Sequence, residues 1–165
     1  MKTCMHCRHA TGPCDAPQAL IANIPDSQLS GLSYRDNDDQ YHYKWSRLHS
    51  QGGAGGWVAE TRSSDEYIQA DFGQLMRIQG IATQARHHDV SYYVTRYWIL
   101  YSTDGITFDR VRNDNYGTFM GNSDMTSVVE NSFTVLVARF IRLQTLRVFN
   151  YPSTRWEVYG CSYTP

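Results

Sequence analysis

Runs of β-forming residues separated by turn residues recur along this chain, about every 8 to 12 residues. The clearest are residues 94–102, VTRYWILYS, and residues 135–149, VLVARFIRLQTLRVF. β-branched and aromatic side chains suit a pleated, half-buried surface, and Asp104-Gly105 suits a hairpin turn that needs positive φ. No long helical period interrupts the pattern. The chain is therefore predicted to be all-β, with an antiparallel sandwich of strands.

Two of the longer runs are predicted to contain breaks. Residues 66–84 are expected to form two strands separated at Asp71-Phe72-Gly73, because Gly and Asp favour turns. Residues 128–133 and 135–149 are likewise expected to be separate strands. Trp57, which follows a glycine-rich segment, is expected in the core.

Length and charge limit the classes of function. The 165 residues suffice for one domain with a single hydrophobic core. With 15 Lys and Arg against 16 Asp and Glu, the net charge is -1, which argues against a nucleic-acid partner and favours neutral partners or short-range contacts. Twelve tyrosines favour Tyr-rich recognition loops. No segment reaches the roughly 18 apolar residues of a membrane span, and residues 1–14 lack the apolar core of a signal peptide.

Two cysteines stand near opposite ends of the predicted sandwich. A bridge between Cys14 and Cys161 would close a very long loop, which the chain-entropy model values at about 5 kcal/mol. It would also require an oxidising compartment. Free thiols in a cytosolic protein are the alternative that these residues leave open.

The N-terminal extension carries the other two cysteines, Cys4 and Cys7. With His6 and His9 they could ligate zinc, but a structural zinc site usually needs a second ligand cluster, which the chain lacks. We expect instead a local Cys4–Cys7 bridge, or interchain bridges that form a disulfide-linked homo-oligomer.

Residues 34–46, YRDNDDQYHYKWS, combine acidic and aromatic side chains. Tyr41, Tyr43 and Trp45 would point to one side if the segment is extended. One interpretation is a solvated acidic loop whose aromatic residues pack on the core. The other is a ligand-facing loop that offers carboxylates to a polyol and a ring to its apolar face. Calcium is a further alternative near Asp36, Asp38 and Asp39, although the spacing is not that of an EF-hand.

Residues 86–93, RHHDVSYY, contain more polar and aromatic side chains than a hairpin connection requires. They are therefore predicted to be part of a binding surface. His87 and His88 lack a carboxylate at a spacing that would orient them as a metal or catalytic pair, and no nucleophile motif accompanies them. Residues 52–56, GGAGG, bend sharply or admit a close neighbour, and they lack the Lys of a phosphate-binding loop. We therefore expect a binding protein and not an enzyme.

Several motifs in this order, among them IPDSQ, RLHSQGGAGGW, YIQADFG, YWILYSTDG and RWEVYGC, closely resemble the discoidin domain. This family is also called the coagulation factor V/VIII type C domain. The resemblance covers residues 14–161 and leaves an N-terminal extension, 1–13, and a tail, 162–165, outside it. It implies an eight-stranded antiparallel jelly-roll sandwich with the galactose-binding-domain fold. It also implies a Cys14–Cys161 bridge and three loops projecting from one end, at residues 35–45, 49–57 and 85–93.

The resemblance further implies a secreted or extracellular, non-catalytic module that binds sugars, phospholipid head groups or matrix proteins. Members that bind galactose-type sugars are similar in the third loop, where Gln84, Arg86 and Asp89 match. We therefore predict a lectin-like cell-adhesion domain for glycans or glycoproteins. Its predicted ligand-binding residues are Asp38, Asp39, Tyr41, Tyr43, Arg86, His87, His88, Asp89 and Tyr92.

Two alternatives stay open for these loops. The same surface could bind an extracellular protein, with Cys4 and Cys7 linking copies into a multivalent adhesive. Phospholipid binding is disfavoured, and membrane insertion is not expected, because carboxylates at the loop tips would be desolvated beside anionic lipid. Arg86 itself has a structural alternative, a salt bridge that joins the first loop to the third.

Overall fold

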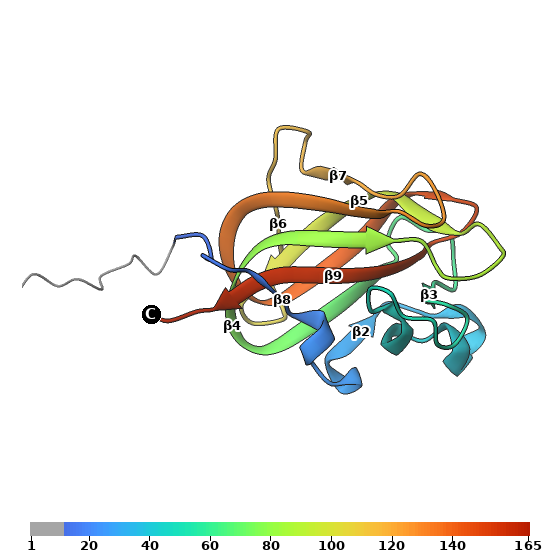
Figure 1. Cartoon of the computed structure of the whole chain (residues 1–165), viewed down its shortest axis with the longest axis horizontal. Helices are drawn as coiled ribbons and strands as arrows, with labels where there is room; N and C mark the ends of the chain where they lie inside the picture. Colours follow the sequence, from blue (N-terminus) through green and yellow to red (C-terminus); the bar gives the residue numbers. More distant parts are fainter. Residues whose placement is uncertain (1–11) are drawn as a thin grey trace, which may run out of the picture.

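The computed structural model describes residues 12–165. Nine antiparallel strands lie in this part of the chain, and the predicted all-β class and jelly-roll sandwich are confirmed (Figure 1). They are β1 Gln18–Ala19, β2 Leu29–Gly31, β3 Trp57–Val58, β4 Tyr67–Gln84, β5 Tyr93–Ser102, β6 Asp109–Arg110, β7 Thr118–Met120, β8 Val128–Phe149 and β9 Ser153–Ser162. Five 3-10 turns are η1 Ile21–Asn23, η2 Asp26–Gln28, η3 Arg35–Asn37, η4 Asp39–Tyr41 and η5 Tyr43–Ser46.

Strand β4 is at the centre of the sandwich and pairs with both β8 and β9, while β8 also pairs with β5. The expected breaks within β4 and β8 are wrong, because each runs on as one long, curved strand (Figure 1). At Asp71-Phe72-Gly73 the pairing register of β4 with β8 shifts between Asp71 and Met76. Such an irregularity bends a strand without ending it, which explains why the turn residues did not mark a boundary.

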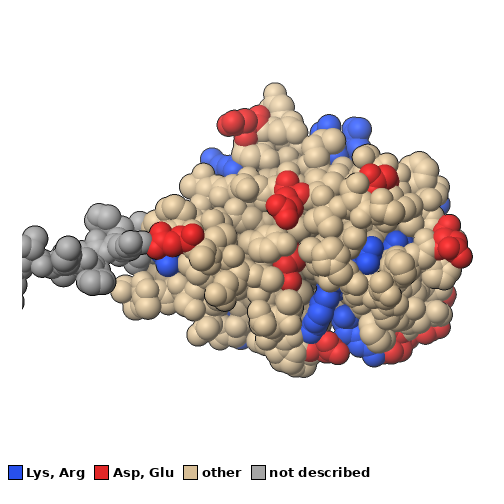
Figure 2. Space-filling view, in the orientation of Figure 1, with Lys and Arg blue, Asp and Glu red and all other residues tan. Residues whose placement is uncertain are grey.

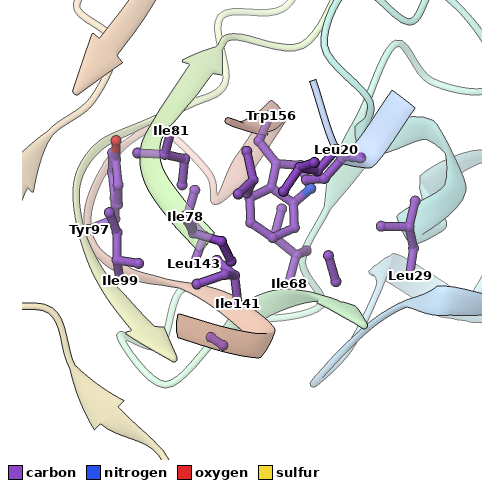
Figure 3. Close-up of a cluster of buried hydrophobic side chains, with 14 of the residues drawn as sticks. Leu20, Leu29, Ile68, Ile78, Ile81, Tyr97, Ile99, Ile141, Leu143 and Trp156 are labelled. Carbon is purple, nitrogen blue, oxygen red and sulfur yellow. The ribbon is translucent and has the colours of Figure 1, made fainter. Parts of the chain in front are cut away.

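The hydrophobic core fills the space between the two layers. Trp57 and Trp156 are fully buried, as predicted for Trp57, and they share one core cluster with Ile, Leu and Tyr side chains from β4, β5 and β8 (Figure 3). Both indole N–H groups have partners: Trp57 donates to the carbonyl of Ser33 at 2.8 Å, and Trp156 to Ser46 Oγ at 3.1 Å. These bonds fasten Ser33 and the end of η5 to the core.

The beginning of the described chain, at residue 12, and the C-terminus lie at the end of the sandwich opposite the long loops (Figure 1). Cys14 and Cys161 form the predicted disulfide, with Cα atoms 5.9 Å apart across 147 residues of sequence. Cys4 and Cys7 lie outside the described residues. No helix among residues 12–165 is long and apolar enough to cross a membrane.

Candidate functional site

Three loops meet at the end of the sandwich away from the C-terminus, as the resemblance implied (Figure 1). We call them loop 1 (residues 35–45), loop 2 (49–57) and loop 3 (85–93). Loop 2 lies between the others, because Ala54 N donates to the carbonyl of Gln40 at 2.7 Å and His87 N donates to the carbonyl of Gly55 at 2.6 Å. The three loops therefore form one hydrogen-bonded unit.

Glycine is required in loop 2 by this close packing. Gly55 has φ +80°, and a Cβ added there would overlap the carbonyl group of His87 in loop 3. Gly53 has φ +57°, and a Cβ there would overlap the carbonyl of Gln40 in loop 1. Both positions combine left-handed backbone with an approach that a side chain would prevent. The glycine-rich segment thus acts as the spacer between two recognition loops.

Loop 1 is not extended, which corrects the expected alignment of its rings. It forms the consecutive turns η3, η4 and η5, because Asp38 accepts from Gln40 N at 3.1 Å and His42 Nδ1 accepts from Lys44 N at 3.1 Å. Local side-chain caps of this kind compete with extended backbone. Tyr41 is half-buried beside loop 3, while Trp45 packs over loop 2 and donates from Nε1 to the carbonyl of Asp39.

Tyr43 belongs to the core and not to the ligand surface, so its predicted role in stacking on a ligand is wrong. Its side chain is only 9% exposed, and its ring meets the Tyr34 ring edge-on at 5.3 Å. Burial raises the pKa of the Tyr43 phenol to about 12. The ring therefore fixes loop 1 onto the sandwich.

The acidic residues of loop 1 do not converge on a cation site. Within residues 12–165 no group of three or more His, Cys, Asp and Glu side chains is arranged to hold a metal ion. Asp38 is occupied by Gln40 N and Nε2, and Asp39 forms an ion pair with Lys44 Nζ at 2.6 Å. The suggested calcium site at Asp36, Asp38 and Asp39 is therefore not supported. The carboxylates shape the loop.

Arg86 is the most unusual side chain at this end of the molecule. It is 5% exposed, yet its Nε is buried without a hydrogen-bond partner, and its terminal nitrogens donate to no described residue. The alternative of a salt bridge from Arg86 to loop 1 is therefore wrong. Its guanidinium carbon lies 5.2 Å from the centre of the Tyr92 ring. Burial, with a smaller effect of nearby Arg35, lowers the pKa of Arg86, while Tyr41 and Tyr92 act in the opposite direction.

Arg86 begins a row of alternating arginine and tyrosine side chains. The guanidinium carbon of Arg35 lies 5.6 Å from the Tyr92 ring centre and 4.1 Å from that of Tyr151. The guanidinium carbon of Arg62 lies 5.2 Å from the Tyr151 ring centre, and the ring centres of Tyr92 and Tyr151 are 5.8 Å apart. We call Arg86, Tyr92, Arg35, Tyr151 and Arg62 the arginine–tyrosine row. Cations over ring faces at these distances are attracted by the π electrons.

Arg35, Arg62 and Tyr151 were not predicted as site residues. They come from three separate segments, and Tyr151 lies in the connection between β8 and β9. That connection is fastened to the site by two bonds: Asn150 Nδ2 donates to the carbonyl of Ser91 at 2.9 Å, and Tyr151 Oη donates to the carbonyl of Glu60 at 2.8 Å. The only local signal was the position of Arg35 at the start of loop 1.

The remaining predicted residues lie on the rim of loop 3. His87, His88 and Asp89 are exposed, and their side chains contact no described hydrogen-bond partner. Val90 beside them is 43% exposed. The structure thus brings Tyr41 close to Arg35 and Arg86 of the arginine–tyrosine row, and it leaves His87, His88 and Asp89 free at the tip.

Beneath the row lies a second buried arginine, which the sequence did not single out. Arg155 of β9 is 4% exposed and donates from Nε to the carbonyl of Ala85 at 2.7 Å and from Nη1 to that of Ser50 at 2.9 Å. Gln84, also buried, accepts from His49 N at 3.2 Å. Arg155 and Gln84 form the base of the site, because they hold loops 2 and 3 to the sandwich.

A hollow on the described surface lies away from the loops. It has a volume of about 1030 Å³ and lies between segment 109–117 and residues 134–136 of β8. None of its lining residues carries a buried polar atom without a partner. We therefore place the candidate site at the loops, where Arg86 carries such an atom.

Comparisons with known proteins agree with this architecture. Residues 33–158 match the family model described as F5/8 type C domain. Lactadherin from Bos taurus is 34% identical over 158 residues, which cover 90% of this chain and 37% of lactadherin. The chain therefore spans little more than a third of the length of that relative.

Two solved structures show the same fold. Discoidin II of Dictyostelium discoideum superimposes with a TM-score of 0.76 at 24% identity, covering 90% of this chain and 60% of the other. The family 32 CBM from C. perfringens NanJ, solved in complex with galactose, has a TM-score of 0.61 at 19% identity, covering 87% and 98%. Fold, loop arrangement and family match together show that the chain belongs to the F5/8 type C domain family.

Proposed function

We propose that this protein is a non-catalytic, lectin-like module that binds galactose-type glycans through its three-loop end. The observation that carries the proposal is Arg86, which is nine-tenths buried and has hydrogen-bond donors that no described residue accepts. Leaving a buried donor unpaired costs free energy, so such a group is more often found where a ligand completes its bonds. Hydroxyl and ring oxygens of a sugar are acceptors of the required kind.

The surroundings of Arg86 suit a sugar. Tyr92 and Tyr41 lie beside the guanidinium group and offer ring faces to the apolar side of a pyranose, while Arg86 offers directed donors. Sites of this type join a small number of polar groups to aromatic walls. The galactose complex of a protein with the same fold supports the choice of galactose-type sugars.

A binding role fits these loops better than catalysis. His87 and His88 are exposed and have no carboxylate or hydroxyl partner among the described residues, so nothing orients an imidazole for proton transfer. The Cys14–Cys161 bridge supports a secreted or extracellular location, because disulfides persist in oxidising compartments. Glycoproteins on cell surfaces or in the matrix are the partners that this location offers.

A glycan array tests the proposal directly. The chain should bind a subset of galactose-terminated glycans, and soluble galactose should compete. A chelator should leave the signal unchanged, because the loop carboxylates form no cation site among the described residues. Binding to no glycan on the array would refute the proposal.

Two matched tyrosine variants give the array result a residue-level control. Tyr92→Ala removes a ring of the site and should weaken the best glycan about tenfold. Tyr116→Ala removes a ring that is 93% exposed in the 113–117 connection, away from the loops, and should not change binding. Equal affinity of the two variants would show that the glycan binds elsewhere.

A further inference from the structure

The arginine–tyrosine row contains three cations with no matching anion. The ion pairs of the described chain involve Lys44, Arg47 and Arg139, and none involves Arg35, Arg62 or Arg86. The guanidinium carbons of Arg35 and Arg86 both lie near the same Tyr92 ring, 5.6 and 5.2 Å from its centre. The row therefore concentrates positive charge in a chain whose net charge is -1.

Three acidic residues in or beside loop 1, namely Asp38, Asp39 and Glu60, have partners outside the row, and Asp89 of loop 3 forms no ion pair with it. Asp39 is paired with Lys44 at 2.6 Å, and Asp38 accepts from Gln40. Glu60 accepts from the backbone N–H of Asp36 at 2.5 Å. Figure 2 shows Lys and Arg atoms among uncharged surface toward the loop end at the right, with Asp and Glu atoms along the outer edge. No ion pair of the described residues joins an acidic side chain to the row.

Hydrogen bonds to the backbone hold parts of the row in place. Tyr151 is fixed by its bond to the carbonyl of Glu60, and loop 3 is fixed to the same connection through Asn150 and Ser91. The guanidinium carbon of Arg35 lies 4.1 Å from the centre of the Tyr151 ring, and Arg35 pairs with no carboxylate of the described residues. Planar donors of this kind match the two oxygens of a carboxylate or sulfate.

A group of like charges that includes the buried Arg86 and the partly buried Arg35 is unfavourable unless an anion joins it. From the row, its missing counter-charge and the buried donors of Arg86, we propose that the glycan bound here is acidic, a sugar that carries a carboxylate or sulfate group. Arg86 binds the sugar ring beside Tyr92, and Arg35 and Arg62 bind the anionic group. The inference rests on the proposed glycan-binding function and specifies its ligand class.

Galactose and galacturonate are a matched pair of probes, because they share stereochemistry and differ at C6 in a carboxylate. Surfaces coated to equal density with each sugar should be compared at the same ionic strength with the full chain. We expect about tenfold tighter binding to galacturonate, the effect of one charge-assisted contact. A 6-sulfated galactose surface should behave like galacturonate.

Single-arginine variants locate the preference. Arg35→Gln and Arg62→Gln should each reduce the galacturonate-to-galactose affinity ratio severalfold. Arg147→Gln is the matched control, since it removes the same charge from an exposed arginine of β8 with no ion-pair partner among residues 12–165, and it should leave the ratio unchanged. A ratio that falls equally in all three variants would indicate general charge attraction and overturn the inference.

The outcomes separate the two proposals. Galactose binding equal to or tighter than galacturonate binding refutes the acidic ligand and leaves the lectin function intact. Binding to no glycan surface refutes both. Vesicles of phosphatidylcholine with and without phosphatidylserine complete the test, and Arg35-dependent binding to phosphatidylserine without glycan binding would assign the row to a lipid anion and overturn the inference.

Discussion

Two arginines at the loop end, Arg155 and Arg86, are buried to almost the same extent but differ in their hydrogen bonds. Arg155, at the base, is 4% exposed and donates to two loop carbonyls. Arg86, above it, is 5% exposed and donates to none. Gly56 lies between them, so close that an added Cβ would be 3.2 Å from Arg155 Cγ and 3.3 Å from Arg86 Cβ. Burial alone therefore does not show whether an arginine is structural or available to a ligand. The hydrogen bonds of its guanidinium group make this distinction.

Stability should be most sensitive to substitution of Arg155, at the base of the site. Arg155→Met leaves the carbonyls of Ala85 and Ser50 without their donors, and we expect a loss of about 3 kcal/mol in the free energy of unfolding. Urea unfolding with the disulfide intact measures it. Arg147→Met, at an exposed position, should change stability by less than about 0.5 kcal/mol. Similar values for the two would remove the distinction between structural and free arginines.

The glycine-rich spacer between loops 1 and 3 should come next. Gly55→Ala places a Cβ against the His87 carbonyl at φ +80°, so we expect a cost of about 2 kcal/mol and weaker glycan binding as loops 2 and 3 separate. Gly80→Ala is the control. Its Cβ would be 3.4 Å from the nearest atom, the Asn131 carbonyl oxygen, and its φ is not in the left-handed region. If both variants unfold at the same denaturant concentration, loop 2 is not the tight spacer described.

Arg86→Met should have a smaller effect on stability than either. It removes a buried charge that makes no hydrogen bond to the described chain and replaces it with an apolar side chain of similar length. The free energy of unfolding without ligand should rise or change by less than about 1 kcal/mol. A loss as large as that of Arg155→Met would show that Arg86 is structural.

The smallest effect concerns an arginine with a conventional partner. Arg139 binds Asp71 with two hydrogen bonds, of 2.7 and 2.8 Å, and this contact is the main cause of the lowered pKa of Asp71. A lowered pKa in the folded state means that the stabilisation is present above the ordinary value of 3.8 and is lost as pH falls through the folded-state pKa. Asp71→Asn should therefore flatten the decline of stability with acid below about pH 4. An unchanged decline would contradict the pairing.

The sequence predicted the sandwich well because alternation and turn chemistry are local properties. It also located loops 1, 2 and 3 and singled out Arg86 and Tyr92. It failed at Tyr43, because the 3-10 turns of loop 1 depend on caps from Asp38 and His42 that override the alternating pattern. Periodicity carries no information about such side-chain bonds.

The rest of the site could not be predicted for a different reason. Arg35, Arg62 and Tyr151 are separated by up to 116 residues, since 151 minus 35 is 116, and they meet only after the β8–β9 connection bonds to Ser91 and Glu60. The missing bonds of Arg86 are equally invisible in a sequence, where a salt bridge to loop 1 was just as plausible. The hydrogen-bond partners of a side chain are known only once the fold is known.

The central claim is that Arg86 is left unpaired for a ligand. It is tested most directly by the dissociation constant of the best array glycan for Arg86→Met, measured by titration calorimetry beside the wild type and Arg147→Met. We predict at least about tenfold weaker binding for Arg86→Met, together with unchanged stability and a wild-type constant for Arg147→Met. Wild-type affinity in a stably folded Arg86→Met protein would contradict the account.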